Sequence, residues 1–225
     1  MLELDKIYNM DCLDGMKQLE DNSIDLIVTD PPYGINYQSN MRKKKFDKIV
    51  QDDNLNWLEP TFSEFYHILN STGALYCFTR WDKFEDFKES IAKVFKIKSV
   101  IVWDKLSGGM GDLNGAYAPS YEICIFAVKE KHELRGKRPK DLIRCGREIE
   151  YLHPTQKPIK LIEKLIKTSS DENDTVFDPF MGSGTTAVAC KKLNRRFIGF
   201  EISKEYCDIA EKRLANAPER LDKWF

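Results

Sequence analysis

Long apolar segments are absent from this sequence of 225 residues, and no apolar run approaches the roughly 18 residues that a membrane-spanning helix needs. The first residues, from Met1 to Lys6, lack the basic and apolar regions that characterise a signal peptide. The six cysteines form no CxxC pair, so neither a zinc site nor a disulfide framework is expected. These absences indicate a cytoplasmic protein with reduced thiols, no metal and no membrane partner.

An excess of charge of either sign is also absent. The formal net charge at pH 7 is only −1, which gives no indication of a polyanionic partner. Basic residues nevertheless gather in two segments: residues 40–48 contain five of them against one acid, and residues 129–147 contain eight against three. Either segment alone could be an ordinary solvated surface. Together they favour contacts with the phosphates of a nucleic acid.

The composition is that of a single soluble globular domain, with 42% hydrophobic and 32% charged residues. Short β-type runs alternate with segments of helical periodicity, a pattern typical of an α/β domain with a mainly parallel sheet. We expect strands over residues 24–29, 74–79, 99–103, 121–128, 175–177 and 196–200. We expect helices over residues 58–69, 81–95, 158–169, 185–192 and 203–214, with a break at Gly73.

A glycine-rich segment over residues 178–186 (DPFMGSGTT) joins an expected strand to an expected helix. Its glycines let the backbone approach a ligand closely, and the N-terminus of the helix offers unpaired N–H groups. Glu201 ends the next strand, 23 positions after Asp178, where an acidic group can bind ribose hydroxyls. The segment is neither a Walker A motif nor a GxGxxG motif. A nucleoside without phosphates, such as S-adenosylmethionine, therefore fits better than NAD or ATP.

A second motif, Asp30-Pro31-Pro32-Tyr33, directly follows the strand expected over residues 24–29. A proline-rich turn would explain the two prolines but would require neither an acid nor an aromatic ring. The prolines fix the backbone so that the Asp30 carboxylate and the Pro31 carbonyl can point at one spot, where two acceptors can hold an exocyclic NH2 group. Tyr33 can stack on the ring that carries this amine, as enzymes acting on extruded bases require.

These motifs resemble those of the amino-type DNA methyltransferases. Residues 30–33 look like the catalytic motif, residues 178–186 like the cofactor motif, and residues 199–201 like the strand end that binds ribose. Residues 153–158 (HPTQKP) resemble the stretch before the first cofactor-side helix, and residues 9–12 (NMDC) resemble the turn whose acid lies by the cofactor adenine. The catalytic motif comes first, which is the permuted order of the beta class. The resemblance spans almost the whole chain and implies a Rossmann-like fold with a seven-stranded, mostly parallel sheet flanked by helices.

The resemblance also implies a role for each matching residue. S-adenosylmethionine would be the cofactor, and Asp30, Pro31, Pro32 and Tyr33 the catalytic residues. An Asp at the first position of the tetrad resembles the adenine-N6 enzymes, whereas Ser is commoner there in the cytosine-N4 enzymes of this class. We therefore expect methylation of adenine N6 in a specific double-stranded DNA sequence by base flipping, with cytosine N4 as the alternative. The residues expected to bind the cofactor are Asp11, Thr155, Lys157, Asp178, Phe180, Gly182, Gly184, Thr185 and Glu201.

Two segments of the single domain are expected to hold DNA. Residues 34–56 are long, polar and lysine-rich, and we predict a mobile loop that closes over the flipped base. Residues 129–152 occupy the place where relatives carry their target-recognition region, and their short length leaves the recognised sequence open. The candidate contacts to DNA are Arg42, Lys43, Lys44, Lys45, Arg135, Lys137, Arg138, Arg144 and Arg147.

Three other functions would use part of these motifs. An RNA- or protein-glutamine-methylating enzyme has a similar tetrad, but its cofactor motif typically comes first in the chain. A nucleotide-binding oxidoreductase would use the glycine-rich segment and not residues 30–33, and an inactive DNA-binding module would not need both motifs intact. The DNA methyltransferase interpretation therefore ranks first, and it leaves a homodimer and a cognate restriction endonuclease open as partners.

Overall fold

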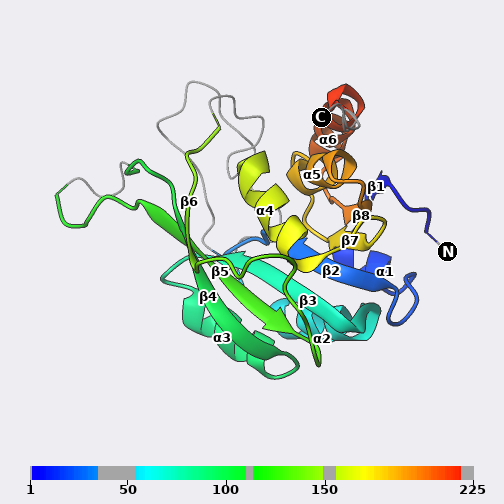
Figure 1. The fold of residues 1–225 in the computed structure, drawn as a ribbon, viewed down its shortest axis with the longest axis horizontal. Coiled ribbons are helices and arrows are strands. Elements are labelled where there is room, and N and C mark those ends of the chain that lie inside the picture. The colour runs from blue at the N-terminus through cyan, green and yellow to red at the C-terminus, as the bar shows by residue number, and fades with distance from the viewer. Residues whose placement is uncertain (1, 35–53, 110–113, 149–155, 219–225) are drawn as a thin grey trace.

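The computed structural model describes residues 2–34, 54–109, 114–148 and 156–218 (Figure 1). Its helices are α1 (Cys12–Met16), α2 (Leu58–Ile68), α3 (Phe84–Ala92), α4 (Ile159–Ser169), α5 (Thr185–Lys192) and α6 (Lys204–Asn216). Its strands are β1 (Lys6–Tyr8), β2 (Ile24–Thr29), β3 (Leu69–Thr79), β4 (Lys96–Asp104), β5 (Tyr121–Val128), β6 (Leu142–Arg144), β7 (Thr175–Asp178) and β8 (Arg196–Phe200).

The strands form one sheet in the order β1-β8-β7-β2-β3-β5-β4-β6, in which only β5 runs antiparallel to its neighbours. The expected α/β fold with a mostly parallel sheet is thus confirmed, but the described sheet has eight strands rather than seven. The sequence pattern did not reveal β1 and β6, because a three-residue strand is too short to show an alternating pattern.

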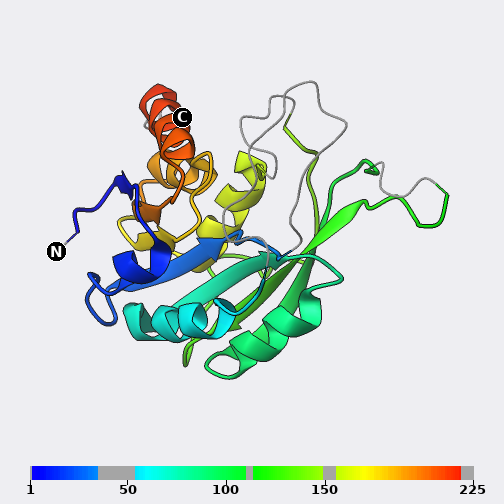
Figure 2. The same cartoon turned by 180° about the vertical axis from the view of Figure 1, so that it is seen from behind.

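Helices cover both faces of the sheet (Figures 1 and 2). Alternate residues of β2 point to opposite faces: Leu26 and Val28 pack in the cluster that includes residues of α4, α5 and α6, whereas Ile27 packs in the cluster with residues of α1, α2 and α3. A parallel strand covered on both faces needs apolar residues at nearly every position, which explains why β2 reads as a continuous apolar run apart from Asp25.

The order of the strands determines where a ligand can bind. From β2 the chain passes through α2 to β3 on one side, and from β7 it passes through α5 to β8 on the other, although β2 and β7 are neighbours. The two connections therefore start from adjacent strands and pass over opposite faces of the sheet. This arrangement leaves a crevice beyond the carboxyl ends of β2 and β7. Both sequence motifs lie there, because residues 30–33 follow β2 and Asp178 ends β7. We call this side of the sheet the carboxyl edge.

Several elements begin or end at positions that the periodicity did not reveal. The helix expected from residue 81 begins at Phe84, because residues 81–83 form a turn in which Asp82 pairs with Arg80. Gly73, expected to break the helix over residues 58–69, lies inside β3. A Cβ on Gly73 would come within 2.5 Å of the Leu69 side chain and 3.0 Å of the Asp25 carbonyl oxygen. Close packing, rather than a turn, explains this glycine.

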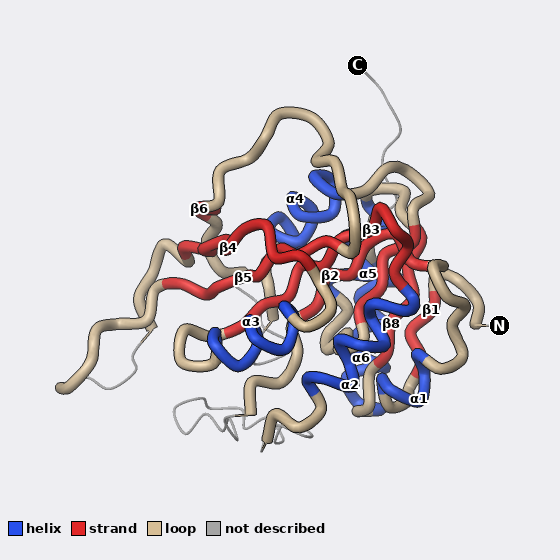
Figure 3. The backbone as a smooth tube through the Cα atoms, turned by 90° about the horizontal axis from the view of Figure 1, so that it is seen from below, coloured by secondary structure: helices blue, strands red, loops and turns tan. Residues whose placement is uncertain are grey.

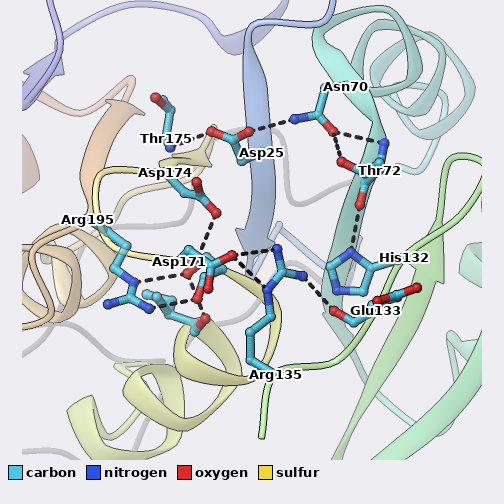
Figure 4. Close-up of polar contacts among 12 residues, drawn as sticks. Asp25, Asn70, Thr72, His132, Glu133, Arg135, Asp171, Asp174, Thr175 and Arg195 are labelled. Atoms are coloured by element: carbon cyan, nitrogen blue, oxygen red, sulfur yellow. Dashed lines mark hydrogen bonds and ion pairs between the residues drawn. The ribbon is translucent and has the colours of Figure 1, made fainter.

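The segment after β5 is fastened to the opposite, amino edge of the sheet (Figure 4). The guanidinium of Arg135 pairs with Asp171 at 3.0 Å, and His132 Nδ1 lies 2.7 Å from the Thr72 carbonyl oxygen. Beside them, the Asp25 carboxylate accepts hydrogen bonds from the Asn70 amide at 2.6 Å and from the Thr175 N–H at 2.7 Å. Asp25 thereby joins the amino ends of β2, β3 and β7 (Figure 4).

The described parts of the connection between β4 and β5 project away from the rest of the fold (Figures 1 and 3). This connection starts at the carboxyl edge, since β4 runs in the same direction as β3. Tyr117 in this connection is fully exposed.

We predict that Asp25→Ala lowers the free energy of unfolding by about 1–3 kcal/mol, because it leaves the Thr175 N–H and the Asn70 amide without their acceptor. Urea denaturation monitored by circular dichroism measures this change. Asp21→Ala, which removes an exposed carboxylate nearby, is the control and should change little. Equal unfolding midpoints for the two variants would show that Asp25 does not join the three strands energetically.

Candidate functional site

An open pocket lies at the carboxyl edge, and its empty space of about 430 Å³ extends into the solvent. Residues from both sequence motifs line it. Asp30 contributes from the tetrad, Asp178, Phe180, Gly182 and Thr185 from the glycine-rich segment, and Lys157 from the segment before α4. The fold thus brings together residues that are nearly 150 positions apart in the sequence.

The tetrad begins where β2 ends, since neither Pro31 nor Pro32 has an N–H to continue the parallel ladder. Tyr33 is only 8% exposed, and its ring meets Phe87 of α3 edge-on at 6.2 Å between centroids. The Tyr33 hydroxyl donates a hydrogen bond to Asp30 Oδ1. The packing of Tyr33 therefore orients the Asp30 carboxylate from one side.

Lys157 holds the same carboxylate from the other side. Its ammonium pairs with Asp30 Oδ2 and lies 3.0 Å from Glu122 Oε2, and its side chain is only 5% exposed. Burial disfavours the charged ammonium, but the carboxylates of Asp30 and Glu122 outweigh it and raise the pKa of Lys157. Burial and the negative charge of Glu122 raise the pKa of Asp30, against the opposing effect of Lys157.

Glu122 and Lys105 extend this group of charges, and the motifs did not reveal either residue. Glu122 lies on β5, and its Oε1 is 2.6 Å from the ammonium of Lys105, which follows β4. A signal was present in the sequence: Glu122 is the one acid in the otherwise apolar run 121–128. A carboxylate in such a strand needs a buried cation as partner, although the sequence cannot say which.

The glycine-rich segment turns sharply between β7 and α5. Gly184 precedes the helix with φ of +82°, and a Cβ there would come within 2.8 Å of Ala210 on α6. Any side chain at Gly184 would therefore strain the backbone and clash. Gly182 also has a positive φ, and its N–H donates a hydrogen bond of 2.8 Å to Glu201 Oε2.

Glu201 and Asp178 hold this segment from two sides. Glu201 lies just after β8 and also accepts a hydrogen bond of 2.8 Å from the Ser203 N–H. Asp178 accepts hydrogen bonds from the Thr186 hydroxyl at 2.6 Å and from the Phe180 N–H at 3.1 Å. Burial raises the pKa of Asp178 to about 7, even though these hydrogen bonds oppose the rise.

A second set of polar contacts holds the segment at Ser183, and the motifs did not predict its members Arg213 and Glu148. Arg213 of α6 donates hydrogen bonds to the Ser183 carbonyl at 2.6 Å and to its hydroxyl at 2.8 Å. The Ser183 hydroxyl also donates to Gln156, 3.2 Å away. Glu148 accepts from Gln156 at 2.7 Å and from the Ile159 N–H, the first N–H of α4, at 2.8 Å.

Comparison with known proteins identifies the family of this site. The N6/N4 methyltransferase family model, described as DNA methylase, matches residues 24–212, which is most of the chain. The chain belongs to this family of DNA methylases. The Type II methyltransferase M.HpaI of Haemophilus parainfluenzae is 34% identical over 89% of this chain and 71% of its own length. The DNA adenine methyltransferase YhdJ of Escherichia coli (strain K12) is 29% identical over 94% of this chain and 83% of its own length.

Solved structures agree with this membership. The crystal structure of the M1.HpyAVI–SAM complex has a TM-score of 0.73 and 31% identity, and covers 93% of this chain and 98% of that one. The cytosine-N4-specific PvuII DNA methyltransferase has a TM-score of 0.75 at 18% identity, covering 97% and 95%, and shows the shared fold. The methylase is thus an S-adenosylmethionine-dependent amino methyltransferase with the expected Rossmann-like fold.

The described residues fit S-adenosylmethionine at this site. The pocket has no cluster of basic side chains for phosphates, and it contains the buried Asp178 carboxylate, which suits a ligand with a cationic amine and sulfonium. Gly182 lines the pocket without a side chain, and the missing side chain of Gly184 leaves room for Ala210 of α6. Among residues 2–34, 54–109, 114–148 and 156–218, no group of three or more His, Cys, Asp or Glu side chains could hold a metal ion. In these same ranges no helix is long and apolar enough to cross a membrane.

Asp11 caps α1, where its carboxylate accepts hydrogen bonds from the N–H groups of Leu13 and Asp14, and lies in the turn after β1, the neighbour of β8. Thr155 lies outside the described residues.

The structure separates the candidate DNA contacts of the methylase. Arg144 ends β6 beside Asp104, at the carboxyl edge, and Arg147 is near enough to Lys105 to lower its pKa, in addition to the larger effect of burial. Arg135 lies at the amino edge in its pair with Asp171, away from the pocket (Figure 4). Lys137 and Arg138 are exposed on the segment between Arg135 and β6. Arg42, Lys43, Lys44 and Lys45 lie outside the described residues.

The raised pKa of Asp178 predicts how stability depends on pH. Because the folded protein binds this proton more tightly than the unfolded chain does, the contribution of Asp178 to stability falls as pH rises from about 4 to about 7. We expect the free energy of unfolding of the cofactor-free protein to fall less over this range in Asp178→Asn than in the wild type. Urea denaturation at about pH 5 and about pH 8 measures the difference. The exposed Asp86→Asn variant should follow the wild type, and parallel curves for Asp178→Asn would contradict the prediction.

Proposed function

We propose that this methylase transfers a methyl group from S-adenosylmethionine to N6 of adenine in a specific double-stranded DNA sequence, after the base has been flipped out of the duplex. The observation that supports it is the position of the Asp30 carboxylate. It lies in the same pocket as Asp178, Gly182 and Thr185, so an amine held by Asp30 would face the cofactor side of the pocket.

The tetrad residues would hold the target amine. The Asp30 carboxylate has acceptor capacity beyond its bonds to Tyr33 and Lys157, because its two oxygens offer about four lone pairs. One amine proton would bind there and the other at the Pro31 carbonyl oxygen. This pairing makes the nitrogen lone pair more available, and positioning with electrostatic stabilisation supplies most of the rate effect.

When bound, S-adenosylmethionine supplies an electrophilic methyl group. Asp178, Phe180, Gly182, Gly184 and Thr185 would hold its methionine part. Glu201 would bind the ribose, and Asp11 would lie by the adenine, with Lys157 and Thr155 nearby. After the nitrogen has gained a methyl group it carries one proton more than the neutral product. Asp30, whose pKa burial raises, is suited to accept that proton.

The choice of adenine is supported by the Asp at position 30, which resembles the tetrad of adenine-N6 enzymes, and by the similarity to YhdJ, a DNA adenine methyltransferase. The same carboxylate could hold the amine of cytosine, so cytosine N4 is the competing target. M.HpaI is a Type II methyltransferase, which supports a restriction endonuclease as partner. A homodimer and a cytoplasmic location remain predictions.

The carboxyl edge is the proposed DNA-binding side. Arg144 ends β6 there beside Asp104, and Arg147 lies near Lys105, which follows β4. We propose that these two arginines contact DNA, together with Lys137 and Arg138 on the approach to β6 and with the basic residues 42–45 of the loop 34–56. Arg135 is not included, because its pair with Asp171 lies at the amino edge.

The reaction is tested by incubating DNA with labelled S-adenosylmethionine, digesting it to nucleosides and identifying the labelled base by mass spectrometry. We expect N6-methyladenine from the wild type, and kcat lower by roughly 100–1,000-fold in Asp30→Ala, because an interaction made in the transition state is lost. Asp86→Asn, a charge change at an exposed position of α3, is the control. Label in N4-methylcytosine would overturn the choice of base, and no label in any DNA would overturn the proposed function.

The DNA-binding side is tested by two matched arginine variants. We predict that Arg147→Gln weakens DNA binding and reduces the slope of log K against log salt concentration by about 1, because one phosphate contact is lost. Arg135→Gln should leave both quantities unchanged, since Arg135 lies at the amino edge. Fluorescence anisotropy with a labelled duplex at several salt concentrations measures both. An equal loss in the two variants would contradict this orientation of the DNA.

A further inference from the structure

Four charged side chains at the carboxyl edge form a continuous row: Asp30, Lys157, Glu122 and Lys105. They come from four segments, namely the end of β2, the segment before α4, strand β5 and the end of β4. Negative and positive charges alternate along the row, so its net charge is zero. The transfer reaction at Asp30 uses only one end of it, and the roles of Glu122 and Lys105 remain open.

The Lys157 ammonium has two carboxylates within reach but does not bind them equally. It forms a short contact with Asp30 Oδ2, and it lies 3.0 Å from Glu122 Oε2. Among the described residues, Glu122 Oε2 is a buried oxygen without an aligned hydrogen bond, so its contact with Lys157 is an ion pair of incomplete geometry. Glu122 therefore has acceptor capacity that faces the ammonium and that the present contact uses only in part.

The target amine must bind the Asp30 carboxylate while the Lys157 ammonium is also bound to that carboxylate. If Lys157 moved away from Asp30 without another partner, a nearly buried ammonium would lose its counter-charge, which is strongly unfavourable. Glu122 removes this cost, because a small movement of the ammonium would complete its hydrogen bond to Oε2. The Lys105 ammonium pairs with the other oxygen of Glu122 and balances the negative charge of this second carboxylate.

We propose that Glu122 is a positioning residue that receives the Lys157 ammonium when the target amine binds Asp30, and that Lys105 sets how strongly it does so. This inference rests on the proposed reaction at Asp30, but it applies equally to an adenine or a cytosine amine. It also explains why an acid is present in the otherwise apolar strand β5.

The proposal predicts opposite pH effects for two variants. In Glu122→Gln the ammonium stays on Asp30 and a neighbouring negative charge is lost, so the pKa of Asp30 falls and the acidic limb of the kcat–pH profile moves to lower pH. In Lys105→Met the carboxylate of Glu122 draws the ammonium away from Asp30, so the acidic limb moves to higher pH. Each shift should be roughly half a pH unit or more.

Other titratable groups near the row do not produce this pattern. Burial raises the pKa values of the Tyr33 hydroxyl and of the Cys77 and Cys124 thiols, so these groups stay protonated throughout the neutral range. Burial raises the pKa of Asp178 to about 7, so Asp178 titrates in this range. Asp178 is the same residue in both variants, so the difference between their acidic limbs reports on the row itself.

The experiment measures kcat and the KM values for DNA and S-adenosylmethionine from about pH 5.5 to 9, with the base that the wild type labels. We expect kcat at the plateau to fall roughly tenfold in Glu122→Gln, with an unchanged KM for S-adenosylmethionine. Glu122→Asp should recover part of the loss. Glu163→Gln is the matched control, because Glu163 is equally exposed and pairs with Lys192 outside the row.

Three results would overturn the proposal: an unchanged kcat in Glu122→Gln, a fall in kcat with the acidic limb unmoved, or limbs of both variants that move in the same direction. The second result would assign Glu122 a structural role only. If Glu122→Gln does not fold, Lys105→Met still tests the proposal. An acidic limb of its kcat–pH profile that does not move would contradict the proposal. A wild type that labels no base would instead refute the proposed function, which separates the two failures.

Discussion

The buried ammonium of Lys157 is the interaction on which the rest of the site depends. It precedes α4 and binds a carboxylate at the end of β2 and another on β5, so it joins three parts of the chain that are far apart in sequence. An isolated charge at 5% exposure would be strongly destabilising, and so would either carboxylate without it. The arrangement therefore forms as a whole, and it fixes Asp30 relative to the glycine-rich segment.

The sheet makes this arrangement possible. Strands β2 and β7 are neighbours, but the helices that follow them cover opposite faces, so the crevice between their ends is not filled by a connection. The tetrad enters this crevice from one strand and the glycine-rich segment from the other. Polar residues at the amino edge, among them Asp25 and Arg135, fasten the same strands at their other ends. The site thus lies at the ends of strands that polar contacts fix at both the carboxyl and the amino edge of the sheet.

The glycine-rich segment shows how much of a site is kept in place by hydrogen bonds within the protein. The Glu201 carboxylate accepts the N–H groups of Gly182 and Ser203, and Arg213 holds Ser183 from α6. These contacts give partners to the N–H groups of Gly182 and Ser203 and to the carbonyl oxygen of Ser183. A ligand would therefore meet a segment whose shape is already formed, and little ordering would be needed when it binds.

The sequence by itself determined the fold class, the carboxyl-edge position of both motifs and the family, because periodicity and short motifs such as residues 30–33 are local properties of the chain. It did not reveal β6, since three residues carry no period, and it did not separate Arg135 from Arg144, since charge in a sequence has no direction. Only the tertiary structure decided which ions pair. Glu122 and Lys105 became part of the site because β5 runs antiparallel between β3 and β4, and strand order depends on packing across the whole domain rather than on any one segment.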